Sequence, residues 1–174
     1  MKKILILGIV ASGKTTLAKE ISQKINIPWY ELDTIVHHET PHGRNKRTPD
    51  EQIAVIQDID RHGAWIFEGT DRASYRCLWD MADRIIFLDT PLWKRKTRIL
   101  LRFIKQNLGL LRFIKQNLGI EKSHYTADAQ MLKMMYKWTR DFERNRVEFE
   151  KRLQPYHHKL IILTDNKKLE LIHP

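Results

Sequence analysis

The feature that most constrains the fold is a glycine-containing stretch, GIVASGKTT at 8–16, which directly follows the apolar run KILIL at 3–7. It matches the pattern G-x-x-x-x-G-K-[ST], whose fixed places are filled by Gly8, Gly13, Lys14 and Thr15. In such a loop the backbone N–H groups turn inward around phosphate oxygens, so glycine is needed where a side chain would collide or φ is positive. A buried strand followed by a phosphate-binding loop is therefore predicted.

A helix is predicted directly after this loop, because apolar residues recur with helical spacing in TTLAKEISQKI at 15–25. Its unpaired N–H groups and its dipole would face the anion. In this pattern Lys14 reaches the β- and γ-phosphates of a nucleotide, and the Thr15 hydroxyl ligates Mg²⁺. The loop residues expected to bind the nucleotide are Gly8, Ala11, Ser12, Gly13, Lys14, Thr15 and Thr16.

Length and composition favour one intracellular domain. The chain has 174 residues, enough to bury a sizeable core. Its one cysteine, Cys77, excludes an internal disulfide and suits the cytoplasm. MKKILILGIV imitates the start of a secretory signal but runs into the loop, and no apolar stretch approaches the ~20 residues of a membrane span. The net charge of +10 indicates polyanionic partners, such as nucleotides, nucleic acid or an anionic membrane surface.

Strands and helices alternate along the chain. Strands are predicted at 3–7, 27–32, 64–69, 83–89 and 158–166, and helices at 15–25, 49–63, 72–81 and close to the C-terminus, up to Leu171. The polar segment 34–49, marked by proline and glycine, is predicted to be a mobile loop. Alternation of this kind indicates an α/β fold, a five-stranded parallel sheet covered by helices on both faces. Ligands bind at the carboxyl edge of such sheets, where the candidate residues closing strands are Asp33, Glu68, Asp89 and Asp165.

A long basic helical insert is predicted at 91–157, and it contains a tandem duplication. LRFIKQNLG occurs at 101–109 and again at 111–119. A shift of ten residues rotates the second copy by about −80° on a straight helix, so the two apolar faces do not superpose. Either the duplication merely lengthens a helix pair, or it forms a basic amphipathic stretch that touches a membrane surface or a partner.

The insert also carries the arginines that phosphoryl transfer would need, since that reaction depends on positioning and charge neutralisation. Arg98 and Arg102 are four apart and share one helical face. Arg112 holds the place of Arg102 in the second copy, about 15 Å further along a continuous helix. We therefore expect Arg98 and Arg102, not Arg112, to meet the transferred group. Arg140, with Arg144 and Arg146, is predicted on one charged helix of a closing lid, or else on a solvated basic face.

Two other functional classes fit the sequence poorly. A regulatory GTPase needs a base-reading N-K-x-D, whereas Asn166 and Lys167 lack the following aspartate. HETPH at 38–42 satisfies the H-E-x-x-H pattern of zinc proteases, which requires a helix, but it contains Pro41. A zinc site is therefore not expected.

Taken in order, the stretches GIVASGKTTLAKEI, IPWYELD, WIFEGTDRAS, ADRIIFLDTP and KLIIL resemble the adenylate-kinase-related phosphate-loop kinases. Within these kinases the chain is most similar to small bacterial proteins often labelled DNA topology modulation proteins. The resemblance covers nearly the whole chain apart from the duplicated decapeptide. It implies a nucleoside-monophosphate-kinase-like fold that uses ATP and Mg²⁺.

The resemblance also implies roles for single residues. Glu68 stands where the relatives usually have an aspartate that orients the water shell of Mg²⁺; it keeps the charge and reaches further. Arg72 matches an arginine facing the acceptor. Arg98 and Arg102 match helix arginines that stack on the nucleotide base and hold phosphate. The turn at 164–167, with Asp165, is where these folds cup adenine.

Asp33 has two interpretations. In related kinases of small hydroxylated molecules an aspartate at this place receives the proton of the acceptor hydroxyl; otherwise Asp33 is a capping residue. The sequence therefore predicts a Mg²⁺- and ATP-dependent kinase of unidentified acceptor. Its expected catalytic residues are Lys14, Asp33, Arg98, Arg102 and Arg140, its metal residues Thr15 and Glu68, and its acceptor residues Asp33 and Arg72. The alternative is an ATP-binding, nucleic-acid-associated regulator; we expect nucleic-acid binding to be weak and non-specific.

Overall fold

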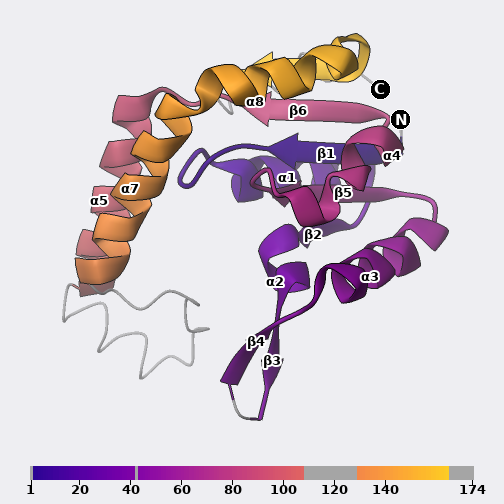
Figure 1. The fold of residues 1–174 in the computed structure, drawn as a ribbon, viewed down its shortest axis with the longest axis horizontal. Coiled ribbons are helices and arrows are strands. Elements are labelled where there is room, and N and C mark those ends of the chain that lie inside the picture. Colours follow the sequence, from indigo (N-terminus) through magenta and orange to yellow (C-terminus); the bar gives the residue numbers. More distant parts are fainter. Residues whose placement is uncertain (1, 42, 108–128, 165–174) are drawn as a thin grey trace.

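The computed structural model describes residues 2–41, 43–107 and 129–164 of the chain. Its centre is a five-stranded parallel sheet in the order β2-β5-β1-β6-β7 (Figure 1). The strands are β1 (Lys3–Leu7), β2 (Trp29–Glu31), β5 (Trp65–Gly69), β6 (Arg84–Leu88) and β7 (Leu160–Leu163). The predicted α/β class and the five parallel strands are confirmed.

Alternate residues of the central strand serve two separate cores, as the period of two in a strand requires. Ile4 and Ile6 pack against Leu17 and Ile21 of α1 (Lys14–Ile25) on one face of the sheet. The neighbouring residues of β1 pack on the other face, in a cluster to which α3 (Pro49–Arg61), α4 (Cys77–Met81) and α8 (Arg146–Leu153) contribute. Because both faces are covered, Ile4 to Leu7 have no solvent exposure.

Among the elements on the second face, one helix has a clear start signal in the sequence. α3 (Pro49–Arg61) begins at a capping box, in which the Thr48 side chain accepts from the Glu51 N–H and Glu51 accepts from the Thr48 N–H. The predicted helix at 72–81 is a 3-10 turn, η1 (Ala73–Tyr75), followed by α4 (Cys77–Met81). A second 3-10 segment, η2 (Gln154–Lys159), leads into β7.

The prediction of a mobile loop at 34–49 is wrong. The strand β2 ends at Glu31, and Leu32 begins a helix, α2 (Leu32–Val36), so Asp33 lies in the first turn of a helix. Next comes an antiparallel hairpin of β3 (His37–Thr40) and β4 (Gly43–Lys46). Gly43 has a φ of 113° and the Thr40 hydroxyl donates to its carbonyl at 2.6 Å, so the proline and glycine mark a turn between strands.

The helical insert divides into two parts. α5 (Leu92–Asn107) and α7 (Ala129–Arg144) lie side by side and lead away from the sheet (Figure 1). The expectation of one helix carrying Arg140, Arg144 and Arg146 is wrong. α7 ends at Arg144, and a new helix, α8 (Arg146–Leu153), begins after Asn145. Phe149 and Leu153 of α8 are buried in the core beside the sheet.

The duplicated segment falls mostly outside the described residues. α5 contains 101–107 of the first copy, whereas the second copy at 111–119, with Arg112, is not described. Asp165 and the helix predicted near the C-terminus also lie beyond the described part of the chain.

Candidate active site at the phosphate-binding loop

The loop between β1 and α1 has the backbone that its glycines predict. Gly13 has a φ of 100° and Ala11 a φ of 59°, both in the left-handed region. The Ser12 N–H donates to the Ile9 carbonyl at 3.2 Å, which closes the turn, and α1 begins at Lys14. Its first-turn N–H groups therefore lie at the loop, as anion binding requires.

Gly8 is needed for space. A Cβ added there would lie 2.6 Å from the Ser12 Oγ, closer than real Cβ atoms approach. The Ser12 side chain is buried, and its Oγ has no hydrogen-bond partner within the described residues. A side chain at position 8 would therefore require the Ser12 hydroxyl to move, and its Cβ would lie 3.1 Å from the Leu88 carbonyl.

Two donors hold the outer side of the loop. The Thr90 hydroxyl donates to the Ser12 carbonyl at 2.8 Å, and Arg98 Nη1 donates to the same oxygen at 2.6 Å. Arg98 Nη1 also reaches the Ala11 carbonyl at 3.3 Å. In a trans peptide the carbonyl and the next N–H point in opposite directions. Fixing the Ser12 carbonyl outward therefore turns the Gly13 N–H to the opposite side.

The residues predicted to bind metal are in contact. The Thr15 hydroxyl donates to Glu68 Oε1 at 2.5 Å, and Lys14 Nζ lies 3.9 Å from Glu68 Oε2. Lys14 Nζ also donates to the Ile9 carbonyl at 3.4 Å. Burial raises the pKa of Glu68, against the lowering effect of Lys14 and Thr15. Glu68 is 2% exposed, so its ionised form lacks solvation.

This pair fits Mg²⁺. Hydroxyl and carboxylate oxygens are the ligands that Mg²⁺ prefers, and the ion is commonly held by one or two protein groups together with phosphates and water. A divalent cation would also add positive charge beside the buried Glu68 carboxylate, whose nearest cation is Lys14 Nζ at 3.9 Å. No cluster of three or more His, Cys, Asp or Glu that could hold a metal is found among the described residues.

The predicted acceptor residues also meet. Arg72 Nη2 donates to Asp33 Oδ1 at 2.8 Å, and both side chains are about one-third exposed. Asp33 comes from the first turn of α2, and Arg72 follows β5 by three residues. The Tyr75 hydroxyl donates to the Thr70 carbonyl at 2.5 Å and fixes the turn that carries Arg72.

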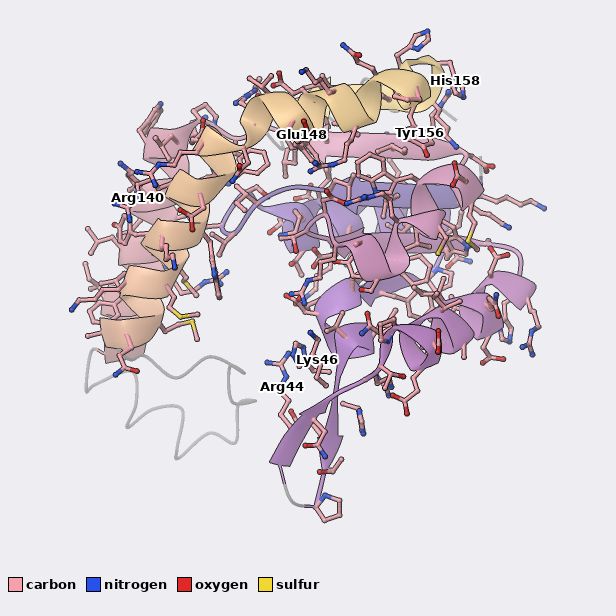
Figure 2. All side chains as sticks on the ribbon, in the orientation of Figure 1. Arg44, Lys46, Arg140, Glu148, Tyr156 and His158 are labelled. Atoms are coloured by element: carbon pink, nitrogen blue, oxygen red, sulfur yellow. The ribbon has the colours of Figure 1, made fainter. Side chains whose placement is uncertain are left out.

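The remaining predicted site residues do not take part in these contacts. Thr16 and Arg102 are exposed, Arg102 on α5. Arg140 is exposed on α7, and Figure 2 shows it on a different part of the molecule from Arg44 and Lys46 of the hairpin. These arginines make no ion pair within the described residues.

Two groups of ion pairs near the site had no local signal in the sequence, although Asp89 and Arg146 were each expected near the site. Arg146 makes a two-pronged ion pair with Asp89 at the end of β6, with contacts of 3.1 and 2.5 Å. Glu143 pairs with the buried Arg95 and lies 4.0 Å from Arg146. These linked ion pairs connect α5 and α7 to the carboxyl edge of the sheet.

The second group surrounds Asp71. Its carboxylate contacts Arg152 Nη2 at 3.0 Å and Arg76 at 3.4 Å. Asp71 and Arg152 are separated by 81 positions in the sequence, so only the docking of α8 brings them together.

Comparison with known proteins gives a local match in sequence and distant likenesses in structure. No protein family model matches the chain. A shikimate kinase from Flavobacterium psychrophilum is 44% identical over 36 residues, a segment that spans 21% of this chain and 21% of that kinase.

The structural likenesses extend further along the chain. Shikimate kinase from Acinetobacter baumannii in complex with shikimate has a TM-score of 0.44 at 14% identity, covering 85% of this chain and 94% of that one. Deoxyadenosine kinase from M. mycoides with bound dATP has a TM-score of 0.47 at 16% identity, covering 98% and 96%. At such scores these likenesses do not address activity or substrate.

None of the described helices is long and apolar enough to cross a membrane.

Proposed function

We propose that the chain is a Mg²⁺- and ATP-dependent kinase that transfers the γ-phosphoryl group to a hydroxyl group of a small molecule. The observation that carries the proposal is the pairing of Asp33 with Arg72 at 2.8 Å, at the edge of the sheet that also holds the phosphate-binding loop. A carboxylate at this edge can accept the proton of an acceptor hydroxyl, and the arginine beside it can orient it. The local match to a shikimate kinase supports the same class.

The proposed reaction follows from these positions. The acceptor oxygen attacks the γ-phosphorus while the bond to the bridging β,γ-oxygen breaks, and ADP leaves with that electron pair. Asp33 accepts the hydroxyl proton and later releases it to solvent. Lys14 and the loop N–H groups hold the β- and γ-phosphates. Mg²⁺, held by Thr15 and Glu68, supplies positive charge to the phosphate oxygens when bound.

Other residues have supporting roles in the proposal. Gly8, Ala11, Ser12, Gly13 and Thr16 shape the loop, and Arg72 orients Asp33 and faces the acceptor. Arg102 and Arg140 are proposed to reach the transferred group when the α5–α7 pair closes, and Asp165 to lie beside adenine. We propose that residues 1–174 form one such domain, with the acceptor side at 34–63 and the insert at 91–157, acting in the cytoplasm.

The experiment is a phosphate-transfer screen with γ-labelled ATP against nucleosides, nucleotides and small hydroxylated metabolites. Lys14→Ala serves as the inactive comparison. It removes a point charge against the β- and γ-phosphates, so we expect ATP affinity to fall at least tenfold, about 1.4 kcal/mol. Measured by titration calorimetry, unchanged ATP binding in a folded Lys14→Ala protein would contradict the phosphate-loop assignment. Labelled product from the parent protein alone supports the kinase.

A second candidate function rests on the net charge of +10. A DNA-associated regulator of the topology modulation type would bind ATP without turning it over. In that case ATP would bind with no phosphate acceptor in the screen, and nucleic acid would bind tightly at physiological salt.

A further inference from the structure

One side of α5 exposes large apolar side chains, and none of the roles above uses them. Trp93, Leu100, Leu101 and Ile104, called here the α5 stripe, are between 42% and 66% exposed. The Thr97 hydroxyl, which lies among them, donates to the Trp93 carbonyl at 3.0 Å, so its polar group is satisfied within the helix. Contiguous exposed apolar side chains mark interaction surfaces.

Helical spacing places these side chains on one face. At about 100° per residue, Leu100 and Ile104 lie about 20° on either side of Trp93, and Leu101 lies about 80° from it. The α5 stripe therefore spans about 100°, the width of the apolar face of an amphipathic helix. Arg95, which pairs with Glu143 of α7, lies about 170° from the middle of the stripe. The α5 stripe thus faces away from α7, in the helix pair that projects from the sheet (Figure 1).

Lysines border the α5 stripe on both sides. Lys96 lies about 40° beyond Leu100, and Lys105 lies about 40° beyond Leu101. Both lysines are exposed, and α5 contains no acidic residue. A lysine side chain packs its aliphatic stem along apolar surface and keeps its ammonium group in a polar layer. An apolar stripe with basic borders is typical of helices that lie in the headgroup layer of a membrane.

The charged borders favour one kind of partner. A second copy of the chain that docked through the same stripe would bring lysines against lysines, and α5 has no acidic residue to compensate. DNA would neutralise the lysines, but protein–DNA interfaces are polar, which suits exposed apolar side chains poorly. An anionic bilayer offers negative charge at its surface and apolar chains beneath it. The net charge of +10 adds to the attraction.

We propose that the α5 stripe binds the surface of an anionic phospholipid bilayer, with its apolar side chains among the acyl chains and Lys96 and Lys105 at the lipid phosphates. The phosphate-binding loop stays accessible in this arrangement. Arg98, which donates to the Ser12 carbonyl of the loop at 2.6 Å, lies about 110° from the middle of the stripe. Membrane binding needs no turnover, so the inference stands or falls separately from the kinase.

Co-sedimentation with vesicles tests the binding. One set of vesicles is phosphatidylcholine alone, and the other contains equal parts of phosphatidylcholine and phosphatidylglycerol. We expect the protein to partition at least tenfold more strongly onto the anionic vesicles, because each lysine near such a surface contributes a factor of about five. No binding to the anionic vesicles overturns the proposal.

Matched double variants separate insertion of apolar side chains from attraction by charge alone. Leu100→Gln with Ile104→Gln removes half of the α5 stripe and keeps good helix formers, and we expect it to weaken partitioning at least tenfold. Met134→Gln with Val147→Gln removes two exposed apolar side chains from α7 and α8 and should stay within twofold of the parent. Equal loss in the two variants, or no loss in the first, overturns the proposal.

The lysines have a matched control of their own. Lys96→Gln with Lys105→Gln should weaken partitioning onto anionic vesicles at least tenfold. Lys24→Gln with Lys151→Gln removes the same number of exposed charges from α1 and α8 and should cost threefold or less. Equal loss would mean that the net charge acts from the whole surface, and it overturns the placement of α5 at the membrane.

Trp93 reports the position of the helix. Brominated acyl chains quench a tryptophan that enters the bilayer. We therefore expect vesicle-dependent quenching in the parent and in Trp138→Phe, and its loss in Trp93→Phe. Quenching that persists in Trp93→Phe would place another surface on the membrane and overturn the proposal.

Two further outcomes would assign the α5 stripe to another partner. If the parent is a dimer without lipid and Leu100→Gln with Ile104→Gln makes it a monomer, the stripe joins two copies of the chain. If that variant loses binding to duplex DNA and keeps binding to vesicles, the stripe contacts nucleic acid. Either result overturns the lipid assignment.

Discussion

Glu68 is the residue whose environment conflicts most with its charge. It lies among the buried residues at the end of β5, and Thr15 and Lys14 are the groups that favour its ionised form. Burial outweighs them and raises the pKa above its ordinary value of 4.5. The same carboxylate is the proposed ligand of Mg²⁺. The protein therefore retains a group that costs stability in the nucleotide-free state, as functional sites often do.

The pH dependence of the nucleotide-free protein follows from this shift. Between the unfolded and the folded pKa of Glu68, the folded state binds more protons, so the free energy of unfolding falls as pH rises through that window. Above the folded pKa the loss is complete. Glu68→Gln removes the titrating group, so we expect it to unfold at a higher temperature than the parent at pH 8 and to lose that advantage at pH 4.

The same substitution should have the opposite effect on function: it stabilises the nucleotide-free protein but weakens Mg²⁺-dependent binding. Glu68→Gln should weaken Mg²⁺-dependent ATP binding at least tenfold, because an amide is a poorer ligand for Mg²⁺ than a carboxylate. Melting curves at several pH values and ATP titrations with and without Mg²⁺ measure both effects. A variant that is less stable than the parent at pH 8 would show that Glu68 contributes to the fold, contrary to this account.

Arg98 was predicted to stack on the nucleotide base and hold phosphate, and its contacts suggest an additional role. Its guanidinium donates to the carbonyls of Ala11 and Ser12, where Thr90 donates as well. These bonds fix the peptide planes of the loop before any ligand arrives. Loss of Arg98 should therefore affect phosphate binding even when no base is present.

We expect Arg98→Ala to lower kcat/KM at least tenfold and to weaken Mg²⁺-dependent binding of inorganic triphosphate, which has no base. Thr90→Val, which removes the other donor to Ser12 with little change in shape, should weaken triphosphate binding in the same direction. If Arg98→Ala impairs ATP but leaves triphosphate unchanged, stacking on the base is its whole role. For comparison, Arg102→Ala should cost tenfold or more in kcat/KM and Arg112→Ala less than threefold.

At the scale of elements, hydrophobic pattern determined what could be predicted. KILIL, AWIFEG and DRIIFLD are near-continuous apolar runs, and each forms a strand buried on both faces. The hairpin of β3 and β4 was missed because its residues are polar throughout and β4 is fully exposed. With no apolar face to bury, its strands leave no period of two in the sequence. Only the turn residues give a signal, and they predict a loop.

The break between α7 and α8 was missed for a related reason. WTRDFERNRVEFEKRL has continuous helical spacing and contains no proline or glycine, so nothing in it predicts an end at Arg144. Docking of Phe149 and Leu153 into the core sets the direction of α8. Tertiary packing therefore outweighs the local pattern here. As a result, Arg146 pairs with Asp89 instead of lying on the predicted lid helix.

The start of α3 gives a prediction at this scale. Thr48 and Glu51 satisfy each other's backbone N–H groups in a capping box, and the N–H of Thr48 lowers the pKa of Glu51. We expect Thr48→Ala to lower the free energy of unfolding by about 1 kcal/mol. Thr48→Ser keeps the hydroxyl and should stay close to the parent. Urea denaturation of the three proteins measures the difference, and equal loss in Ser and Ala would show that the hydroxyl is not the cap.

At the scale of the whole molecule, what can be predicted depends on distance along the chain. The loop, Lys14 and Thr15 are contiguous. Glu68 lies at the end of β5 and Asp33 in the helix directly after β2, so parallel topology alone predicts that they share an edge. The ion pairs made by α8 are different. Asp71 meets Arg152 and Asp89 meets Arg146 only because α8 folds back over the sheet, and no spacing in the sequence encodes that return.

The net charge of +10 is also a property of the whole molecule, and α5 contributes basic residues with no acidic residue. If DNA is a partner, log K should fall linearly with log salt, with a slope of about −0.9 for each phosphate contacted. We expect weak binding at physiological salt that does not depend on sequence, because charge without base contacts carries no specificity. Fluorescence anisotropy with two unrelated duplexes over a range of salt concentrations measures both quantities.

Two double charge-reversal variants test whether the net positive charge acts from the whole surface or from one DNA-binding surface. Lys96→Glu with Lys105→Glu changes two exposed residues of α5, and Lys24→Glu with Lys151→Glu changes the same number of charges on α1 and α8. If binding is only electrostatic, both double variants should weaken DNA binding and reduce the salt slope equally. A loss confined to the α5 variant would identify that helix as a nucleic-acid surface. Together with sub-micromolar, sequence-selective binding by the parent, it would favour the DNA-associated regulator over the kinase.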